Sequence, residues 1–87
     1  MTQDSDIEAT ILRLAGARGP HASICPTEAA RALAAEWRPL LGAVRRTAVS
    51  LANAGRIDIL RKGRRIEPAD MKGVIRLRIR PPDESAP

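Results

Sequence analysis

The spacing of apolar residues divides the chain into two parts with different periods. From residue 7 to residue 55, apolar positions recur every three or four residues, as they do on the buried face of a helix. From residue 57 to residue 79 the interval falls to two, which is typical of half-buried strands. This order predicts an α+β fold of three helices followed by a small antiparallel β-ribbon.

The first helix is expected to begin near Ser5. Ser5 and Glu8 have the spacing of a capping box, in which each side chain bonds a backbone N–H of the first turn. Gly16, Gly19 and Pro20 are expected to end this helix. We expect residues 1–5 to be a disordered N-terminus, residues 6–80 to form the folded domain and residues 81–87 to be a flexible C-terminal tail.

A proline is expected in the first turn of each of the next two helices. Pro26 and Pro39 suit that position, because the fixed φ of proline fits there and no backbone N–H is required. Gly55 suits the left-handed conformation that often follows a helix. A short extended segment is expected at residues 23–25. Trp37 is expected to fill the core where the two helices meet.

The residues with strand periodicity allow two pairings. With a turn at Lys62–Gly63, Ile59 falls opposite Ile66, so the apolar residues pair consistently. The alternative pairs residues 56–61 directly with residues 74–79 and leaves a long loop between them. In either case the isoleucines and leucine of the last strand face inward and its arginines face outward. The sequence does not choose between the two registers.

Three helices followed by a β-ribbon is the order of a winged helix-turn-helix. In helix-turn-helix proteins the recognition helix lies in the major groove of DNA. In the winged form the ribbon flanks that helix and contacts the DNA backbone or minor groove. The side chains on the third helix and on the ribbon therefore decide the functional prediction.

Basic residues are concentrated in the second half of the chain. The whole sequence has a net charge of +5, but residues 37–82 contain twelve basic and three acidic residues. Residues 1–36 contain three basic and five acidic residues. A small fold with its positive charge gathered in this way favours a polyanionic partner such as nucleic acid. Trp37 is the only aromatic residue, which disfavours single-strand binding by base stacking.

The exposed face of the third helix is the predicted groove-reading surface. Its candidate residues are Arg38, Arg45, Arg46, Ser50 and Asn53. Arginine and asparagine can make paired hydrogen bonds to the edges of guanine and adenine, and serine can bond a phosphate or a base. A solvated helix face often carries the same residue types, but Val49 in the middle of this face favours a contact surface.

The tip of the ribbon supplies the predicted phosphate contacts. Its candidate residues, which surround Gly63, are Arg61, Lys62, Arg64 and Arg65. Cationic side chains that neutralise phosphates make binding strongly salt-dependent. A charged hairpin can also serve only to resist aggregation, but four basic residues with no acid exceed that need.

Few residues are suited to catalysis or metal binding. The single cysteine, Cys25, and the single histidine, His21, cannot supply a zinc site of several ligands in a monomer. No acid pair is placed for general acid–base catalysis, and no glycine-rich phosphate loop follows a strand. A reactive thiol at Cys25 is an alternative to the usual role of a free cysteine as a small buried hydrophobe. We therefore predict no enzymatic activity, no metal and no cofactor.

Location and assembly are predicted from the same composition. A lone cysteine fits a reducing compartment, and the sequence shows no signal peptide and no apolar run of membrane-spanning length. We expect a cytoplasmic protein without membrane contact. No long helix with a heptad repeat offers a dimer interface, which favours a monomer.

Several short motifs resemble a known bacterial family. They lie at residues 17–20, 24–33, 37–40, 44–46, 54–57, 62–64 and 73–77. They extend over most of residues 7–79 and are similar to domain-of-unknown-function family 3253, with Ile24-Cys25-Pro26 and Trp37-Arg38 as the more specific motifs. The resemblance implies a winged-helix-like fold and no particular activity.

The sequence therefore predicts a bacterial winged helix-turn-helix domain that binds duplex DNA, as a transcriptional regulator or accessory factor. One alternative is a protein-interaction module, in which Val49 and the ribbon edge would dock an acidic protein. Another alternative is a binder of structured RNA. These three classes differ in partner but use the same basic surface.

Overall fold

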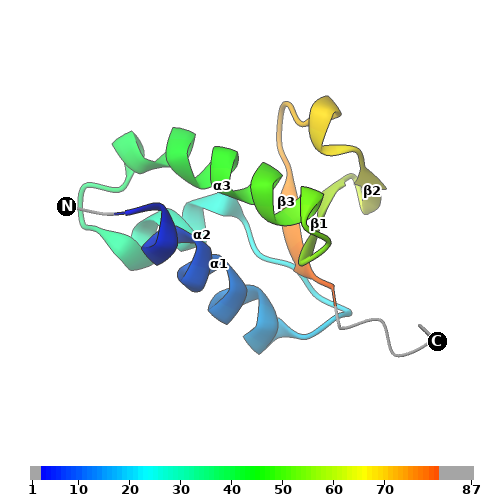
Figure 1. Ribbon diagram of the computed structural model, residues 1–87, viewed down its shortest axis with the longest axis horizontal. Helices are drawn as coiled ribbons and strands as arrows, with labels where there is room; N and C mark the ends of the chain where they lie inside the picture. Colours follow the sequence, from blue (N-terminus) through cyan, green and yellow to red (C-terminus); the bar gives the residue numbers. More distant parts are fainter. Residues whose placement is uncertain (1–2, 81–87) are drawn as a thin grey trace.

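Three helices lie against one face of a small antiparallel sheet in the computed structural model, which describes residues 3–80 (Figure 1). The helical elements are α1 (Asp4–Arg18), α2 (Pro26–Leu33), the short 3-10 helix η1 (Arg38–Leu40) and α3 (Leu41–Asn53). The later elements are β1 (Ile57–Arg61), β2 (Arg64–Ile66), the 3-10 helix η2 (Pro68–Asp70) and β3 (Arg76–Ile79). The predicted α+β fold is confirmed, and it is compatible with a winged helix-turn-helix.

Both strand pairings that the sequence allowed occur together. β1 is the central strand and pairs antiparallel with β2 on one edge and with β3 on the other. Ile59 lies opposite Ile66 in β2 and opposite Leu77 in β3. Lys62 and Gly63 have φ values of 54° and 80°, which suit the tight hairpin turn predicted there. The chain between β1 and β3 therefore folds back as a hairpin and η2 instead of forming one loose loop.

The segment before α2 extends the sheet by one residue. The backbone groups of Ile24 and Leu77 exchange two hydrogen bonds, each 2.8 Å from nitrogen to oxygen. The predicted extended conformation of residues 23–25 is confirmed at this bridge. It ties the connection between α1 and α2 to the outer edge of β3.

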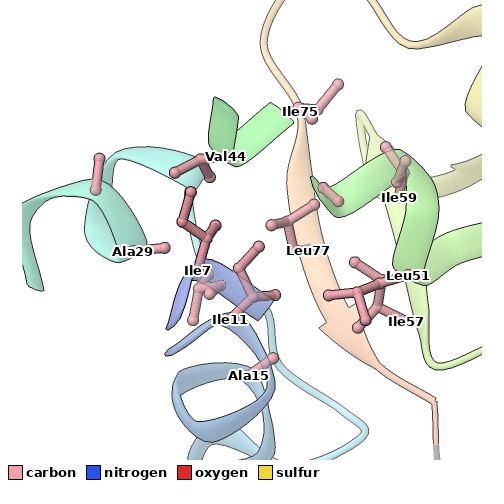
Figure 2. Close-up of a cluster of buried hydrophobic side chains, with 13 residues drawn as sticks. Ile7, Ile11, Ala15, Ala29, Val44, Leu51, Ile57, Ile59, Ile75 and Leu77 are labelled. Atoms are coloured by element: carbon pink, nitrogen blue, oxygen red, sulfur yellow. The ribbon is translucent and has the colours of Figure 1, made fainter. Parts of the chain in front are cut away.

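Aliphatic side chains from all three helices and from β1 and β3 meet in one core (Figure 2). The fully buried large residues are Ile7, Ile11, Ile24, Val44, Ile57, Ile59, Ile75 and Leu77. On α3 the buried face consists of Val44, Thr47, Ala48 and Leu51. Burial of this face fixes the rotation of α3 and leaves the opposite face toward solvent.

The start of α1 differs from the prediction. Gln3, not Ser5, is the N-cap, and its backbone N–H donates to the Asp6 carboxylate at 3.2 Å. Asp6 reaches back three residues as the glutamate of a capping box does, so the helix begins at Asp4 and Ser5 belongs to its first turn. Gly16 lies inside the helix, which ends at Arg18. Residues 81–87, expected to form a tail, lie outside the described residues.

Trp37 is not the core plug that was predicted. It is half-buried and packs against the edge of the core. Its ring stacks with two guanidinium groups, with Cζ of Arg31 and Cζ of Arg38 at 4.9 and 4.5 Å from the ring centroid. Because α2 already ends at Leu33, the short connection to η1 carries Trp37 outward to a position where these cations cover it.

Candidate nucleic-acid interface

The predicted groove-reading residues of α3 are distributed over several parts of the helix. Arg46, Ser50 and Asn53 are exposed, whereas Arg45 is half-buried at the flank that faces the chain before β3. Arg46 and Ser50 border a hollow whose other lining residues include the acidic residues of the α1 N-terminus, Asp4 and Glu8. Asn53 lies at the opposite end, beside the sheet. The single predicted face is therefore divided between different neighbours.

A cation from α3 and a cation from β1 hold the same short segment. Arg45 Nη2 donates to the carbonyl oxygen of Gly73 at 3.3 Å. Arg61 Nη1 donates to the carbonyl oxygen of Asp70 at 3.4 Å. Residues 70–73 therefore bridge α3 and the hairpin, and η2, which ends at Asp70, packs on α3. Lys72 is exposed in this segment between the two arginines.

Strand alternation sorts the cations of the hairpin onto two faces. Directly opposite residues of an antiparallel pair share a face, and successive residues of a strand alternate between faces. Arg61 lies opposite Arg64, two residues from the pair of buried Ile59 and partly buried Ile66, which pack in or against the core, so both arginines lie on the helix side of the sheet. Arg65 is on the other face. The structure thus places Arg61 and Arg64 on the same side as α3 and separates Arg65 from them.

We call the resulting group of cations the basic strip. It consists of Arg45, Arg61, Lys62, Arg64 and Lys72. Within residues 3–80, none of the five forms an ion pair with a carboxylate within 4.0 Å. Sequence reasoning singled out four of them and missed Lys72, because only the tertiary position of residues 70–73 brings Lys72 beside α3.

Arg65 belongs to a second group of arginines, on the face of the sheet away from the helices. Asp58 is only 7% exposed there and accepts hydrogen bonds from Arg78 Nη2 at 3.0 Å and Arg80 Nε at 2.9 Å. Arg80 Nη2 also contacts this carboxylate, and Arg65 Nη1 lies 4.0 Å from it. The arginines of β3 and its end, predicted to face outward, do so, but Arg78 and Arg80 are neutralised locally by Asp58.

The environment of Asp58 favours its charged form. Burial by itself raises the pKa of this carboxyl, but the hydrogen bonds and charges of Arg80 and Arg78 outweigh burial, so the pKa lies below its usual value. The ionised carboxylate thus fixes two guanidinium groups in place. These arginines stabilise the sheet and are less free to bind an external anion than those of the basic strip.

Two other residues of the predicted contact surface, Arg38 and Val49, lie outside the basic strip. Arg38 precedes α3, and its guanidinium lies over the Trp37 ring beside that of Arg31. Val49 is half-buried and packs against the core, whereas the sequence placed it in the middle of an exposed face. Without an exposed Val49, docking of a protein on this face of α3 loses its apolar contact.

Comparison with known families supplies one match. The model of a family described as "Protein of unknown function (DUF3253)" matches residues 4–80. The chain belongs to this family. The DUF3253 match spans every helix and strand of the structure, so the basic strip and the Asp58 cluster both lie within the family domain. A comparison with curated proteins found no match.

Two other properties of the DUF3253 domain bear on the predictions. Among the helices of residues 3–80, none combines the length and the apolar character needed to cross a membrane. In the same part of the chain, no three histidine, cysteine or acidic residues are grouped as metal ligands would be. Cys25 is half-buried at the N-cap of α2, where its backbone N–H donates to Glu28 Oε2 at 2.8 Å.

Proposed function

We propose that this domain binds duplex DNA through the basic strip, with no catalytic step. The observation that carries the proposal is the pair of hydrogen bonds from Arg45 and Arg61 to residues 70–73. These bonds join α3 and the hairpin into one cationic surface. In a helix-turn-helix domain, such a surface would let α3 approach a groove while the hairpin contacts the flanking phosphates.

The charge around the strip favours a polyanion. Glu67 and Asp70 lie in the same part of the chain and offset some of the positive charge, but the five cations of the strip outnumber them. Arg61 and Arg45 use backbone carbonyl oxygens as partners, and no carboxylate of residues 3–80 forms an ion pair with either of them. Binding by this strip would depend mainly on phosphates, with Arg46 and Asn53 as the exposed α3 side chains available for base edges.

The proposal implies a location for the protein in the cell. A single half-buried cysteine fits a cytoplasmic protein, where a transcriptional regulator or accessory factor would meet DNA. A monomer presenting one strip would bind a short site weakly, at micromolar concentrations or above, as non-specific binding does.

The test is a salt titration of duplex binding followed by fluorescence anisotropy. For the wild-type protein, the logarithm of affinity should fall with the logarithm of salt by about 0.9 for each phosphate neutralised. A variant with Lys62→Ala, Arg64→Ala and Lys72→Ala together should lower this slope by about 2 to 3, because three contacts are lost. All three side chains are exposed, so the fold should be retained.

Arg13→Ala is the matched control, because Arg13 is exposed on α1 and lies outside the strip. It should leave the slope of duplex binding unchanged. Absence of duplex binding at low salt, or equal effects of the control and the triple variant, would refute the proposal. Stronger competition by structured RNA than by duplex DNA would replace DNA with RNA as the partner.

A further inference from the structure

A second groove includes Leu60 and Arg76, which lie on the face of the sheet away from the helices, and it reaches the proposed DNA surface at the hairpin. Its volume is about 480 Å³, within the range of sites for small ligands or a few residues of peptide. Its lining includes Ser23, Leu60, Lys62, Gly63, Val74 and Arg76. At the hairpin the groove is bordered by Arg61 and Lys62, which also belong to the basic strip. The lining is mainly apolar, unlike that of the two hollows beside α3.

The apolar character comes from Leu60 and Val74. Leu60 is opposite Arg65 and Arg76 on the two neighbouring strands and is 7% exposed. Val74 is 87% exposed and is the one large hydrophobic residue with such exposure in residues 3–80. An exposed apolar side chain beside a mainly apolar groove is typical of a contact surface, whereas an isolated one needs no partner.

A fixed cation forms one wall of the groove. Arg76 Nε donates to Ser23 Oγ at 2.7 Å, and Arg76 Nη2 donates to the Ser23 carbonyl oxygen at 2.8 Å. A guanidinium has five N–H donors, so three remain without a hydrogen-bond partner in the described part of the chain. Arg76 also has no carboxylate within 4.0 Å among these residues. Ser23 therefore holds an uncompensated guanidinium beside apolar surface.

We infer that this groove docks a short acidic and apolar peptide segment of a partner protein. An apolar side chain of the segment would cover Leu60 and Val74, and a neighbouring carboxylate would bind Arg76. Nucleic acid fits less well, because phosphates would leave the apolar surface of Leu60 and Val74 uncovered. A second copy of this chain also fits less well, because it would bring a net charge of +5 toward the cations of this face.

The inference is tested by NMR titration of ¹⁵N-labelled protein with a synthetic peptide of alternating leucine and aspartate. The backbone signals of Ser23, Gly63 and Val74 should shift and saturate. Val74→Ser and Arg76→Gln should each weaken binding by about tenfold, since each removes one of the two contacts on which recognition depends. Val74 is exposed and glutamine can still bond Ser23, so both variants should keep the wild-type spectrum elsewhere.

Arg13→Gln on α1 is the control, because Arg13 is exposed and lies outside both surfaces, and this variant should bind the peptide as the wild type does. An equal response to a leucine–lysine peptide, or no shift at the three signals, would overturn the inference. Concentration-dependent shifts of the same signals without peptide would identify a second copy as the occupant and also overturn it. Displacement of the peptide by duplex DNA would assign the groove to the DNA surface, again against the inference.

The test of peptide binding can succeed or fail independently of the test of DNA binding. Val74→Ser changes no charge, so duplex affinity and its salt dependence should remain those of the wild type. Loss of peptide binding with duplex binding intact in this variant supports two surfaces. Absence of duplex binding in the wild type would refute the DNA proposal and leave the peptide result unaffected.

Discussion

The two faces of the sheet both carry arginines, but the arginines have different surroundings. On the face away from the helices, Arg78 and Arg80 hydrogen-bond Asp58 and are half-buried. On the helix side, Arg61 bonds a backbone carbonyl and no carboxylate within residues 3–80, and Arg64 is exposed. A count of basic residues treats these groups alike. The comparison shows that the position of one buried carboxylate decides which arginines stabilise the fold and which remain available to a partner.

The largest expected effect comes from removing that carboxylate. Asp58→Ala leaves Arg78 and Arg80 without their acceptor, although both are exposed enough to regain water. We expect the free energy of unfolding to fall by about 2 kcal/mol, below the 3–5 kcal/mol typical of fully buried pairs. Urea unfolding followed by circular dichroism measures this change. Unchanged stability would mean that the Asp58 cluster does not hold the sheet together, and Lys72→Ala serves as the neutral control.

The same cluster predicts how stability depends on pH. Folding lowers the pKa of Asp58 below its ordinary value of 3.8, so the stabilisation is fully present above that value. It is lost as the pH falls through the lower pKa of the folded state, because the protonated carboxyl no longer pairs with the arginines. Urea midpoints measured from neutral to strongly acidic pH should therefore decline most steeply below about pH 4. Asp58→Asn should flatten that decline, and an unaltered profile would contradict the assignment.

The smallest effects separate two neighbouring residues of β2. Arg64→Ala should lower the salt slope of duplex binding by about 0.9 and change stability by less than about 0.5 kcal/mol. Arg65→Ala should leave the slope unchanged and reduce stability by at most about 0.5 kcal/mol, because its pair with Asp58 is 4.0 Å long and its side chain is 62% exposed. Equal slopes for the two variants would show that strand alternation does not divide the cations.

Local signals in the sequence predicted much of the fold. The Lys62–Gly63 turn with Ile59 opposite Ile66, the start of α2 at Pro26 and the extended segment before it all depend on residues close in sequence. The start of α1 was misplaced because Gln3 with Asp6 satisfies the same hydrogen bonds as Ser5 with Glu8 would. Short-range rules could not rank these two caps.

The candidate site depends on contacts between distant residues, which periodicity does not reveal. Gly73 accepts from Arg45, twenty-eight positions away, and Asp58 pairs with Arg78 and Arg80, twenty and twenty-two positions away. The prediction grouped Arg65 with the other cations of the hairpin because it did not assign each residue of this short strand to a face of the sheet. Lys72 gained significance only when the position of its segment against α3 was known.

The bridge between Ile24 and Leu77 has a consequence for the order in which the domain can fold. β3 lies between β1 and the segment before α2, and its Leu77 contributes to the core. During synthesis the three helices emerge well before β3, so their apolar faces stay partly uncovered until the last strand has been made. Such distant pairing slows folding relative to a purely helical domain of this size, and the nascent helices would expose apolar surface to chaperones in that interval.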